Sequence, residues 1–282
     1  MTEFVQYLAT GLALGCTFAL VASGIVFIAR VTGIVNFSQG IFSVLGGLTA
    51  ASVVGAGLPM AVAVIVALIV SVVVGVIAAI VIMGRRSTGH DSSMIISLGF
   101  GILLYAPMVM IWGDQPVSLR GLSGTFSLGG VTLSYQYLLI IGVTLLVFAG
   151  IALFFSKTYL GKALTASASN PESAEVLGIK VRRMGVIAFV IASMLGAVAG
   201  ILLMPIQPMA FNSDVSLVLN GFAAAVFGQL TRPGRAFAGA MILGVAQSLT
   251  AGYLSAAYQL PVALVILILV LVWQSRRKVL VA

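Results

Sequence analysis

The stretch KTYLGKALTASASNPESAEVLGIKVRR, residues 157–183, is a polar segment in a chain that otherwise carries very little charge. The apolar sequence on both sides of it is of the kind that lies in lipid. We therefore expect this polar segment to lie outside the membrane, where a soluble partner can bind it. It holds seven of the chain's twenty charged residues: Lys157, Lys162, Glu172, Glu175, Lys180, Arg182 and Arg183.

The composition of the whole chain indicates a polytopic membrane protein. Of its 282 residues 61% are hydrophobic and 7% are charged, whereas about 25% of residues are charged in soluble proteins. The 32 glycines suit helices that pack closely through small residues, because lipid supplies no hydrophobic force between helices. The net charge of +8 does not require a nucleic-acid partner, since basic residues accumulate in cytoplasmic loops during membrane insertion.

Apolar runs along the chain predict an all-α bundle of membrane-spanning helices. A helix needs roughly 20 apolar residues to cross the hydrocarbon core, and on this criterion we expect about eight to ten segments. We expect residues 1–282 to form a single membrane domain that includes the polar segment as a short helical loop. The candidate segments are 8–29, 34–55, 60–83, 92–112, 135–156, 184–205, 215–231, 236–253 and 259–275.

The basic residues predict how the chain is oriented. If every segment crosses, nearly all of them lie on one side, which the positive-inside bias identifies as the cytoplasm. Only Arg120, in the 113–134 loop, falls clearly on the other side. The N-terminus is then outside and the C-terminus cytoplasmic. The cytoplasmic basic residues outside the polar segment are Arg85, Arg86, Arg232, Arg235, Arg276, Arg277 and Lys278.

Two of the candidate segments are atypical. The 34–55 segment begins among Gly33, Asn36 and Gly40, so a broken or re-entrant helix is an alternative to a continuous one there. The 215–231 segment reaches only about 25 Å at 1.5 Å per residue, against a hydrocarbon core of about 30 Å. The number of true crossings therefore depends on these two segments.

Within the polar segment, the sequence predicts two short helices separated by a turn. Asn170 is a favourable N-cap for the second helix, Pro171 suits its first position, and Glu172 suits the positive end of its dipole. Gly178 predicts its end, and we expect Ala174 and Leu177 to share one side. The alternative to a docking role is that this loop only covers the inner surface of the bundle.

Two blocks of the sequence resemble a known family. YLGKALTASASNPESAEVLGIKV, residues 159–181, lies between two apolar helices, and TGIVNFSQGIFSVLGG occupies residues 32–47. This combination is similar to the membrane permease subunits of branched-chain amino acid ABC transporters. One departure occurs in FGQLTRPGRAFAGA, where Gln229 stands in place of the second glycine of a Gly-Gly pair usual in the family.

The resemblance implies that residues 161–180 form a cytoplasmic coupling loop that docks on an ATP-binding subunit. It also implies that ATP is used by that partner and that this chain needs no cofactor of its own. The residues expected to take part are Gly161, Lys162, Ala163, Ala166, Asn170, Pro171, Glu172, Ala174, Gly178 and Ile179.

The sequence also lacks the chemistry of several other classes of protein. No phosphate-binding loop is present, because Gly161-Lys162 is followed by Ala163 and has no glycine five residues before it. Every Asp and Glu lies at or near a segment end, which disfavours an ion-coupled carrier. With a single histidine and a single cysteine, we expect no catalytic residues and no metal site. Cys16, inside an apolar run, is expected to be a packing residue.

A few amides and hydroxyls interrupt the apolar runs. Most of them are expected to hydrogen-bond neighbouring helices, because buried amides in a membrane must find partners. Asn36, Gln39 and Asn220 are the candidates for a polar substrate path, because they occur beside glycines where a helix can break. The remaining interior polar residues are Ser38, Gln229 and Gln247.

The resemblance implies an importer subunit of the cytoplasmic membrane that translocates a small polar solute, above all branched-chain or related amino acids. Its expected partners are two ATP-binding cassette subunits, a second permease that is a paralogue or another copy of this chain, and an extracytoplasmic solute-binding protein. Two alternatives are a stand-alone facilitator or channel for a solute such as urea or an amide, and a membrane scaffold that transports nothing.

Overall fold

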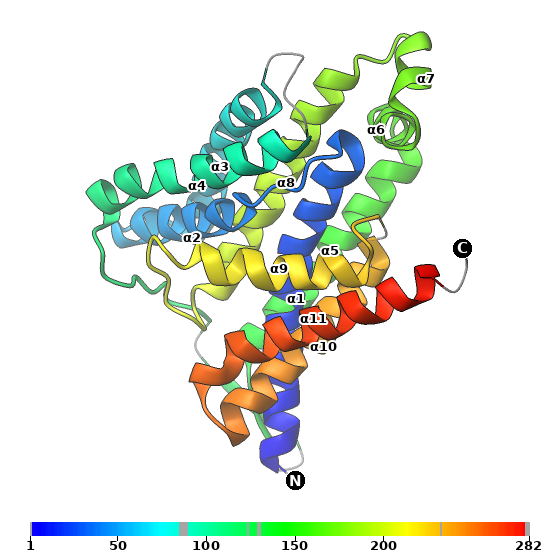
Figure 1. Cartoon of the computed structure of the whole chain (residues 1–282). Helices are drawn as coiled ribbons and strands as arrows, with labels where there is room; N and C mark the ends of the chain where they lie inside the picture. The colour runs from blue at the N-terminus through cyan, green and yellow to red at the C-terminus, as the bar shows by residue number, and fades with distance from the viewer. Residues whose placement is uncertain (1, 85–89, 123, 129–130, 232, 280–282) are drawn as a thin grey trace.

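The computed structural model describes residues 2–84, 90–122, 124–128, 131–231 and 233–279 (Figure 1). Its described part is a bundle of α-helices with one small β-hairpin, which confirms the predicted all-α membrane bundle. The helices are α1 (Thr2–Thr32), α2 (Gln39–Gly55), α3 (Met60–Met83), α4 (His90–Trp112), α5 (Tyr135–Lys157), α6 (Tyr159–Ser169), α7 (Pro171–Val176), α8 (Val181–Leu203), α9 (Asp214–Phe227), α10 (Pro233–Tyr253), the 3-10 turn η1 (Ala256–Tyr258) and α11 (Gln259–Val279).

Each of the nine predicted segments corresponds to a helix, but the helices differ in length. In the described residues, six have the length and hydropathy of a membrane span: α1, α3, α4, α5, α8 and α10. Helices α2 and α9 are apolar but shorter, with 17 and 14 residues, and the described apolar stretch of Ala256–Val272 is also short. The prediction that 215–231 contains a short helix is therefore confirmed.

The predicted 34–55 segment is broken, not continuous. Helix α1 ends at Thr32, and Gly33 adopts a φ of 72°, a left-handed conformation that favours glycine. The chain then stays non-helical until α2 begins at Gln39. The Asn36 side chain stabilises the non-helical turn, because its Oδ1 accepts a hydrogen bond of 3.1 Å from the backbone N–H of Ser38.

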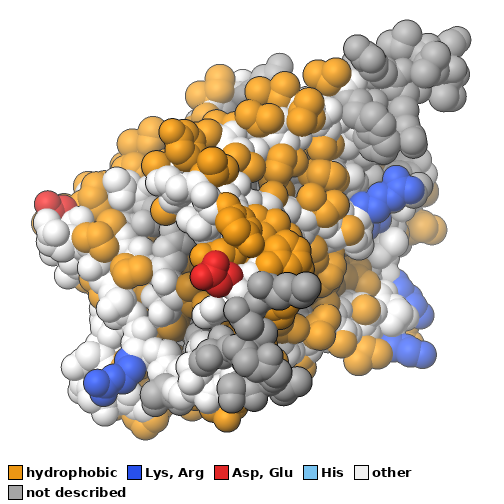
Figure 2. Space-filling model, turned by 90° about the horizontal axis from the view of Figure 1, so that it is seen from below, with side chains coloured by type: hydrophobic (Ala, Val, Ile, Leu, Met, Phe, Trp, Pro, Cys, Tyr) orange, Lys and Arg blue, Asp and Glu red, His pale blue; other side chains and the backbone are white. Residues whose placement is uncertain are grey.

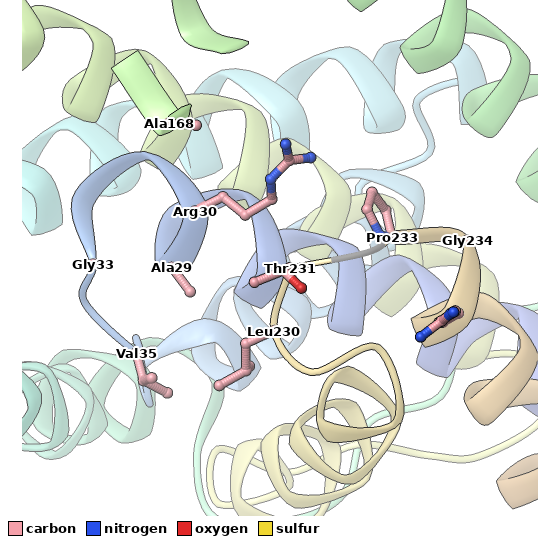
Figure 3. A pocket seen from close by; sticks show the side chains of 10 residues that line it. Ala29, Arg30, Gly33, Val35, Ala168, Leu230, Thr231, Pro233 and Gly234 are labelled. Atoms are coloured by element: carbon pink, nitrogen blue, oxygen red, sulfur yellow. The ribbon is translucent and has the colours of Figure 1, made fainter. Parts of the chain in front are cut away.

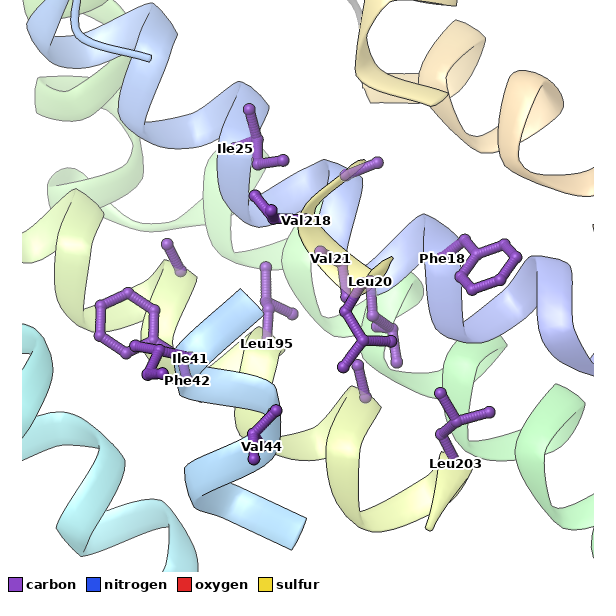
Figure 4. Packing of buried hydrophobic residues seen from close by; sticks show 14 of the residues in the cluster. Phe18, Leu20, Val21, Ile25, Ile41, Phe42, Val44, Leu195, Leu203 and Val218 are labelled. Atoms are coloured by element: carbon purple, nitrogen blue, oxygen red, sulfur yellow. The ribbon is translucent and has the colours of Figure 1, made fainter. Parts of the chain in front are cut away.

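Helices α1 and α8 form the centre of the bundle. Side chains of α1, α2, α8 and α9 interlock there (Figure 4), and Cys16 is buried in this core as expected of a packing residue. Backbones approach closely at glycines. A Cβ atom on Gly15 would lie 2.9 Å from Ala240 O on α10, and one on Gly200 would collide with the carbonyl group of Ser43. This is the small-residue packing expected of helices in lipid.

The loop at 113–134 contains a β-hairpin that the sequence analysis did not predict. Strands β1 (Thr125–Leu128) and β2 (Val131–Ser134) pair antiparallel, with Phe126 opposite Leu133. Short strands of this kind carry a weak sequence signal, but TFSL and VTLS do alternate apolar and polar residues. A backbone pair between Val117 and Met209 joins the loop to the chain between α8 and α9.

The polar segment lies at one end of the bundle. Helices α6 and α7 project at one end, and the N-terminus lies away from them (Figure 1). Arg182 Nη2 donates a hydrogen bond of 3.1 Å to the Gly84 carbonyl oxygen, so the turn after α3 lies beside the polar segment. Arg85, Arg86 and Arg232, on which the predicted orientation also rests, lie outside the described residues.

The surface is mostly apolar. Figure 2 shows one face on which many hydrophobic side chains are exposed and only a few charged side chains lie among them. Large apolar side chains are exposed along the outer faces of α3, α4 and α5, for example Ile65, Ile102 and Leu146. An apolar outer face of this extent is what a bundle surrounded by lipid requires.

Candidate coupling and transport site

Helix α6 begins in a tight corner after α5. Thr158 is its N-cap, and the Thr158 side chain accepts a hydrogen bond of 3.0 Å from the Gly161 N–H. The same hydroxyl donates to the Phe154 carbonyl oxygen at 2.7 Å. A Cβ atom on Gly161 would collide with that carbonyl oxygen, so only glycine allows α6 to fold back this closely on α5.

Helix α7 has the caps that the sequence predicts. The Asn170 side chain accepts a hydrogen bond of 3.0 Å from the Ser173 N–H, and Pro171 occupies the first turn. At the other end Gly178 has a φ of 83°, and the Ile179 N–H donates to the Ala174 carbonyl oxygen at 3.0 Å. This is the hydrogen-bond pattern of a Schellman motif, which ends the helix.

A small apolar cluster anchors the polar segment to the bundle. Leu164 on α6 is 1% exposed and belongs to one buried cluster with Val31 at the end of α1 and Met184 and Ala188 at the start of α8. Ile179, which follows α7, packs against the same cluster. The polar segment is therefore packed against the ends of two central helices, α1 and α8.

The predicted coupling residues divide into two groups by exposure. Gly161 and Ala174 are buried, and Ala163, Ala166 and Ile179 are half-buried, so these five position the segment. The other five are exposed; they are Lys162, Asn170, Pro171, Glu172 and Gly178.

Three large apolar side chains on the polar segment are also exposed, and the sequence analysis did not select them. Tyr159, Val176 and Leu177 are 92%, 88% and 77% exposed. The expectation that Ala174 and Leu177 share one side is wrong, because Ala174 is buried and Leu177 follows the last residue of α7. The signal that could have revealed these residues is a large apolar side chain inside a polar loop.

A cavity of about 890 Å3 opens beside the polar segment. In Figure 3, Arg30 of α1 extends between Ala168 of α6 and Thr231. Arg235 also lines the cavity, which therefore carries positive charge. The remaining lining residues come from the end of α1, the break after it, the connection after α9 and the start of α10: Ala29, Gly33, Val35, Leu230, Pro233 and Gly234.

The wall formed by the connection between α9 and α10 has an unusual backbone. Gln229 and Leu230 have φ values of 54° and 57°, in the left-handed region that favours glycine. The Gln229 side chain is exposed, which corrects its prediction as an interior polar residue. The backbone here takes a glycine-like conformation even though glutamine occupies the position.

Asn36 lies in the break before α2, and Gln39 is the first residue of α2. Both are fully buried. Gln39 Nε2 donates a hydrogen bond of 2.8 Å to the Ala192 carbonyl oxygen on α8. It fits against α1 only because Gly24 has no side chain. Asn36 Nδ2 and Gln39 Oε1 have no hydrogen-bond partner in the described residues, so each retains one unused polar atom.

Asn220, the third candidate for the substrate path, lies on α9 and is 6% exposed. Its Oδ1 accepts a hydrogen bond of 2.6 Å from Gln247 Nε2 on α10, so it also joins two helices. Two residues further along α9, the Phe222 ring packs against Phe37 in the break after α1, with the ring centroids 5.6 Å apart. Val35, the residue before Asn36, lines the cavity.

Comparison with known proteins identifies the family. The family model described as "Branched-chain amino acid transport system / permease component" matches residues 7–271. The chain belongs to this family of branched-chain amino acid transport permeases. It is therefore a transport subunit and a multi-pass membrane protein, not an enzyme.

Relatives of the permease align along nearly its whole length. It is 30% identical to the high-affinity branched-chain amino acid transport system permease protein BraD of Pseudomonas aeruginosa, over 96% of this chain and 94% of that one. It is 28% identical to the corresponding protein LivH of Escherichia coli K12, over 95% of this chain and 92% of the relative. These comparisons give no support to a stand-alone facilitator.

A solved structure shares the fold of the permease. The PsaBC complex of Streptococcus pneumoniae with a Fab contains a chain that superimposes with a TM-score of 0.52. The alignment covers 95% of this chain and 94% of that one at 16% sequence identity, so the likeness concerns the fold alone.

Proposed function

We propose that this permease moves branched-chain or closely related amino acids across the cytoplasmic membrane as one subunit of an ATP-driven importer. The substrate class is supported by the names of BraD and LivH, which align with it almost from end to end. Residues 1–282 would act as one membrane domain, with the N-terminus outside and the C-terminus in the cytoplasm. The clustering of Arg30, Arg182 and Arg235 at the end that carries α6 and α7 supports this orientation.

The proposed assembly contains a second permease, a paralogue or another copy of this chain, two ATP-binding cassette subunits and an extracytoplasmic solute-binding protein. The chain itself has no phosphate-binding loop. ATP is accordingly bound and hydrolysed on the partner subunits, and the permease converts their movement into a change of access. Because a binding protein would deliver the solute, the permease itself would need little affinity for it within the membrane.

The observation that carries the coupling proposal is the buried cluster around Leu164. The 161–180 segment presents Val176, Leu177 and nearby Tyr159 to the outside, while Leu164 packs with the ends of α1 and α8. Exposed apolar anchors surrounded by polar residues are typical of docking surfaces. A partner that moves this segment would move the helices that border the cavity.

The cavity beside Arg30 is the proposed inner mouth of the substrate path. Asn36 follows the lining residue Val35 in sequence, and the path would continue from the cavity past Asn36 and Gln39 toward Asn220, with the Phe37–Phe222 ring pair closing it. Unused polar atoms on Asn36 and Gln39 would meet the solute when the path opens. Broken helices that expose such groups are used in this way by many transporters.

The coupling proposal is tested by a double variant, E172K with G178V. The charge reversal alters the docking surface, and valine at a φ of 83° disturbs the end of α7. In proteoliposomes that contain the permease with its ATPase subunits and binding protein, we expect uptake to become uncoupled from ATP hydrolysis. Normal uptake together with normal stimulation of the ATPase would refute the docking role.

A labelling experiment tests the contact directly. With C16A as background, a cysteine introduced by V176C should react with a maleimide in the isolated permease and be protected in the assembled transporter. Q115C, an exposed position in the 113–134 loop on the proposed outer side, is the control and should remain reactive when the permease is assembled with the ATPase subunits alone. Equal reactivity of V176C before and after assembly would contradict the proposed surface.

The substrate class is tested by uptake in the same proteoliposomes. Radiolabelled leucine, isoleucine and valine should accumulate only with ATP and the binding protein, whereas urea should not. Leucine flux without nucleotide and without partners would instead favour a facilitator.

A further inference from the structure

A second cavity, which shares no lining residue with the first, lies between α3, α5 and α8. Its volume is about 450 Å3. Each of the three helices α3, α5 and α8 has the length and hydropathy of a membrane span, so the cavity is a lateral groove in the membrane part of the protein. Its apolar lining residues are Met60 and Val64 on α3, Leu139, Val143 and Val147 on α5, and Val198, Ile201 and Leu202 on α8.

The length of the groove along α5 corresponds to one leaflet of a bilayer. On α5 its lining runs from Gln136 near the start of the helix to Val147. At 1.5 Å per residue this is about 16 Å. Half of a hydrocarbon core of about 30 Å is roughly 15 Å. An acyl chain that enters the groove at the Gln136 end of α5 would therefore reach about as far as the middle of the bilayer.

The mouth of the groove is held by specific contacts. The Gln136 side chain is 7% exposed; its Oε1 accepts a hydrogen bond of 3.1 Å from the Leu122 N–H, and its Nε2 donates to the Leu202 carbonyl oxygen at 3.4 Å. Gly121 fits tightly here, since a Cβ atom on it would lie 2.8 Å from Pro205 Cβ. The residue before it, Arg120, is thereby positioned at the mouth.

Arg120 supplies the charge that an apolar groove by itself lacks. Its side chain is exposed, and within the described part of the chain no hydrogen bond or ion pair engages it. The sequence places no other basic residue in the 113–134 loop. A guanidinium group matches a phosphate through paired, charge-assisted hydrogen bonds.

We infer that this groove binds one phospholipid, with its phosphate on Arg120 and an acyl chain along Val143 and Ile201. The charge of Arg120, the apolar lining and a length along α5 that matches one leaflet agree on this occupant. An apolar helix of a second permease would match the lining but would leave Arg120 at the mouth without an anion. The inference does not depend on the proposed substrate or on the coupling segment.

The test is native mass spectrometry of the full-length protein released from nanodiscs that contain phosphatidylglycerol. The wild type should retain one bound phospholipid. R120Q should retain about tenfold less, the loss expected for one charge-assisted contact, and R120K, which keeps the charge but not the paired contact, should retain an intermediate amount. V143W, which fills the groove and leaves Arg120 intact, should also lose the lipid.

K157Q is the matched control, because it removes one positive charge at the opposite end of α5. It should retain the lipid as the wild type does, and the elution profile in size exclusion should show that each variant is folded. Wild-type retention in R120Q or in V143W would overturn the inference. So would a protein that carries no lipid and dimerises through this face, with V143W abolishing the dimer.

Discussion

Gly161 of α6 lies so close to the end of α5 that a Cβ atom on it would be 2.6 Å from the Cα atom of Phe155. Helix α6 therefore folds directly back onto the helix that precedes it. This contact sets the position of Leu164, three residues later, within the cluster shared with α1 and α8. The position of the 161–180 segment thus depends on one residue without a side chain.

The first prediction concerns Gly161→Ala. The new methyl group collides with backbone atoms that cannot rotate away, so α6 should shift, at a cost of about 1–3 kcal/mol. We expect ATP-driven uptake to fall at least several-fold while the protein remains in the membrane. Gly142→Ala on α5 is the control, because no atom lies within 4 Å of its Cβ position. Equal uptake by the two variants would contradict the prediction.

The second prediction concerns the cap of α7. Asn170→Ala removes the acceptor for the Ser173 N–H, and the loss of such a cap costs about 0.5–2 kcal/mol. Hydrogen exchange of the α7 amides should become faster, while the amides of α8 should keep their protection. Asn170→Asp retains the acceptor and should behave as the wild type. Unchanged exchange in Asn170→Ala would show that the cap does not hold this helix.

Local chemistry explains which parts of the polar segment could be predicted. Caps depend on a few neighbouring residues, so Asn170, Pro171 and Gly178 were sufficient to predict the limits of α7. The exposure of Val176 and Leu177 could not be predicted in the same way, because it depends on how α7 sits on the rest of the molecule.

The surroundings of the path residues depend on contacts between distant parts of the sequence. Gln39 bonds to Ala192, and Asn220 to Gln247, across separate helices. The sequence predicts that such amides bond to neighbouring helices but not to which ones. The cavity at Arg30 likewise joins three regions of the chain and has no local signature.

The third prediction concerns Gln229, whose φ of 54° costs a residue with a side chain about 1–2 kcal/mol. Gln229→Gly should relieve this strain and raise the thermal unfolding temperature in detergent. The net gain should stay within about 1 kcal/mol, because glycine also gains entropy in the unfolded state. Gln229→Ala keeps the strain and should give no gain. An unfolding temperature no higher for Gln229→Gly than for Gln229→Ala would contradict this interpretation.

The fourth prediction concerns the link between α4 and α9. Tyr105 Oη donates a hydrogen bond of 2.7 Å to Oδ1 of Asp214, which is 5% exposed. Tyr105→Phe removes this donor from a buried carboxylate and should destabilise the protein by about 1–3 kcal/mol, measured by thermal unfolding. Adding Asp214→Asn removes the charge and should recover part of the loss.

The control is Tyr258→Phe, at an exposed position, which should change stability by less than about 0.5 kcal/mol. If Tyr105→Phe were equally mild, the hydrogen bond would contribute nothing to holding the start of α9 against α4.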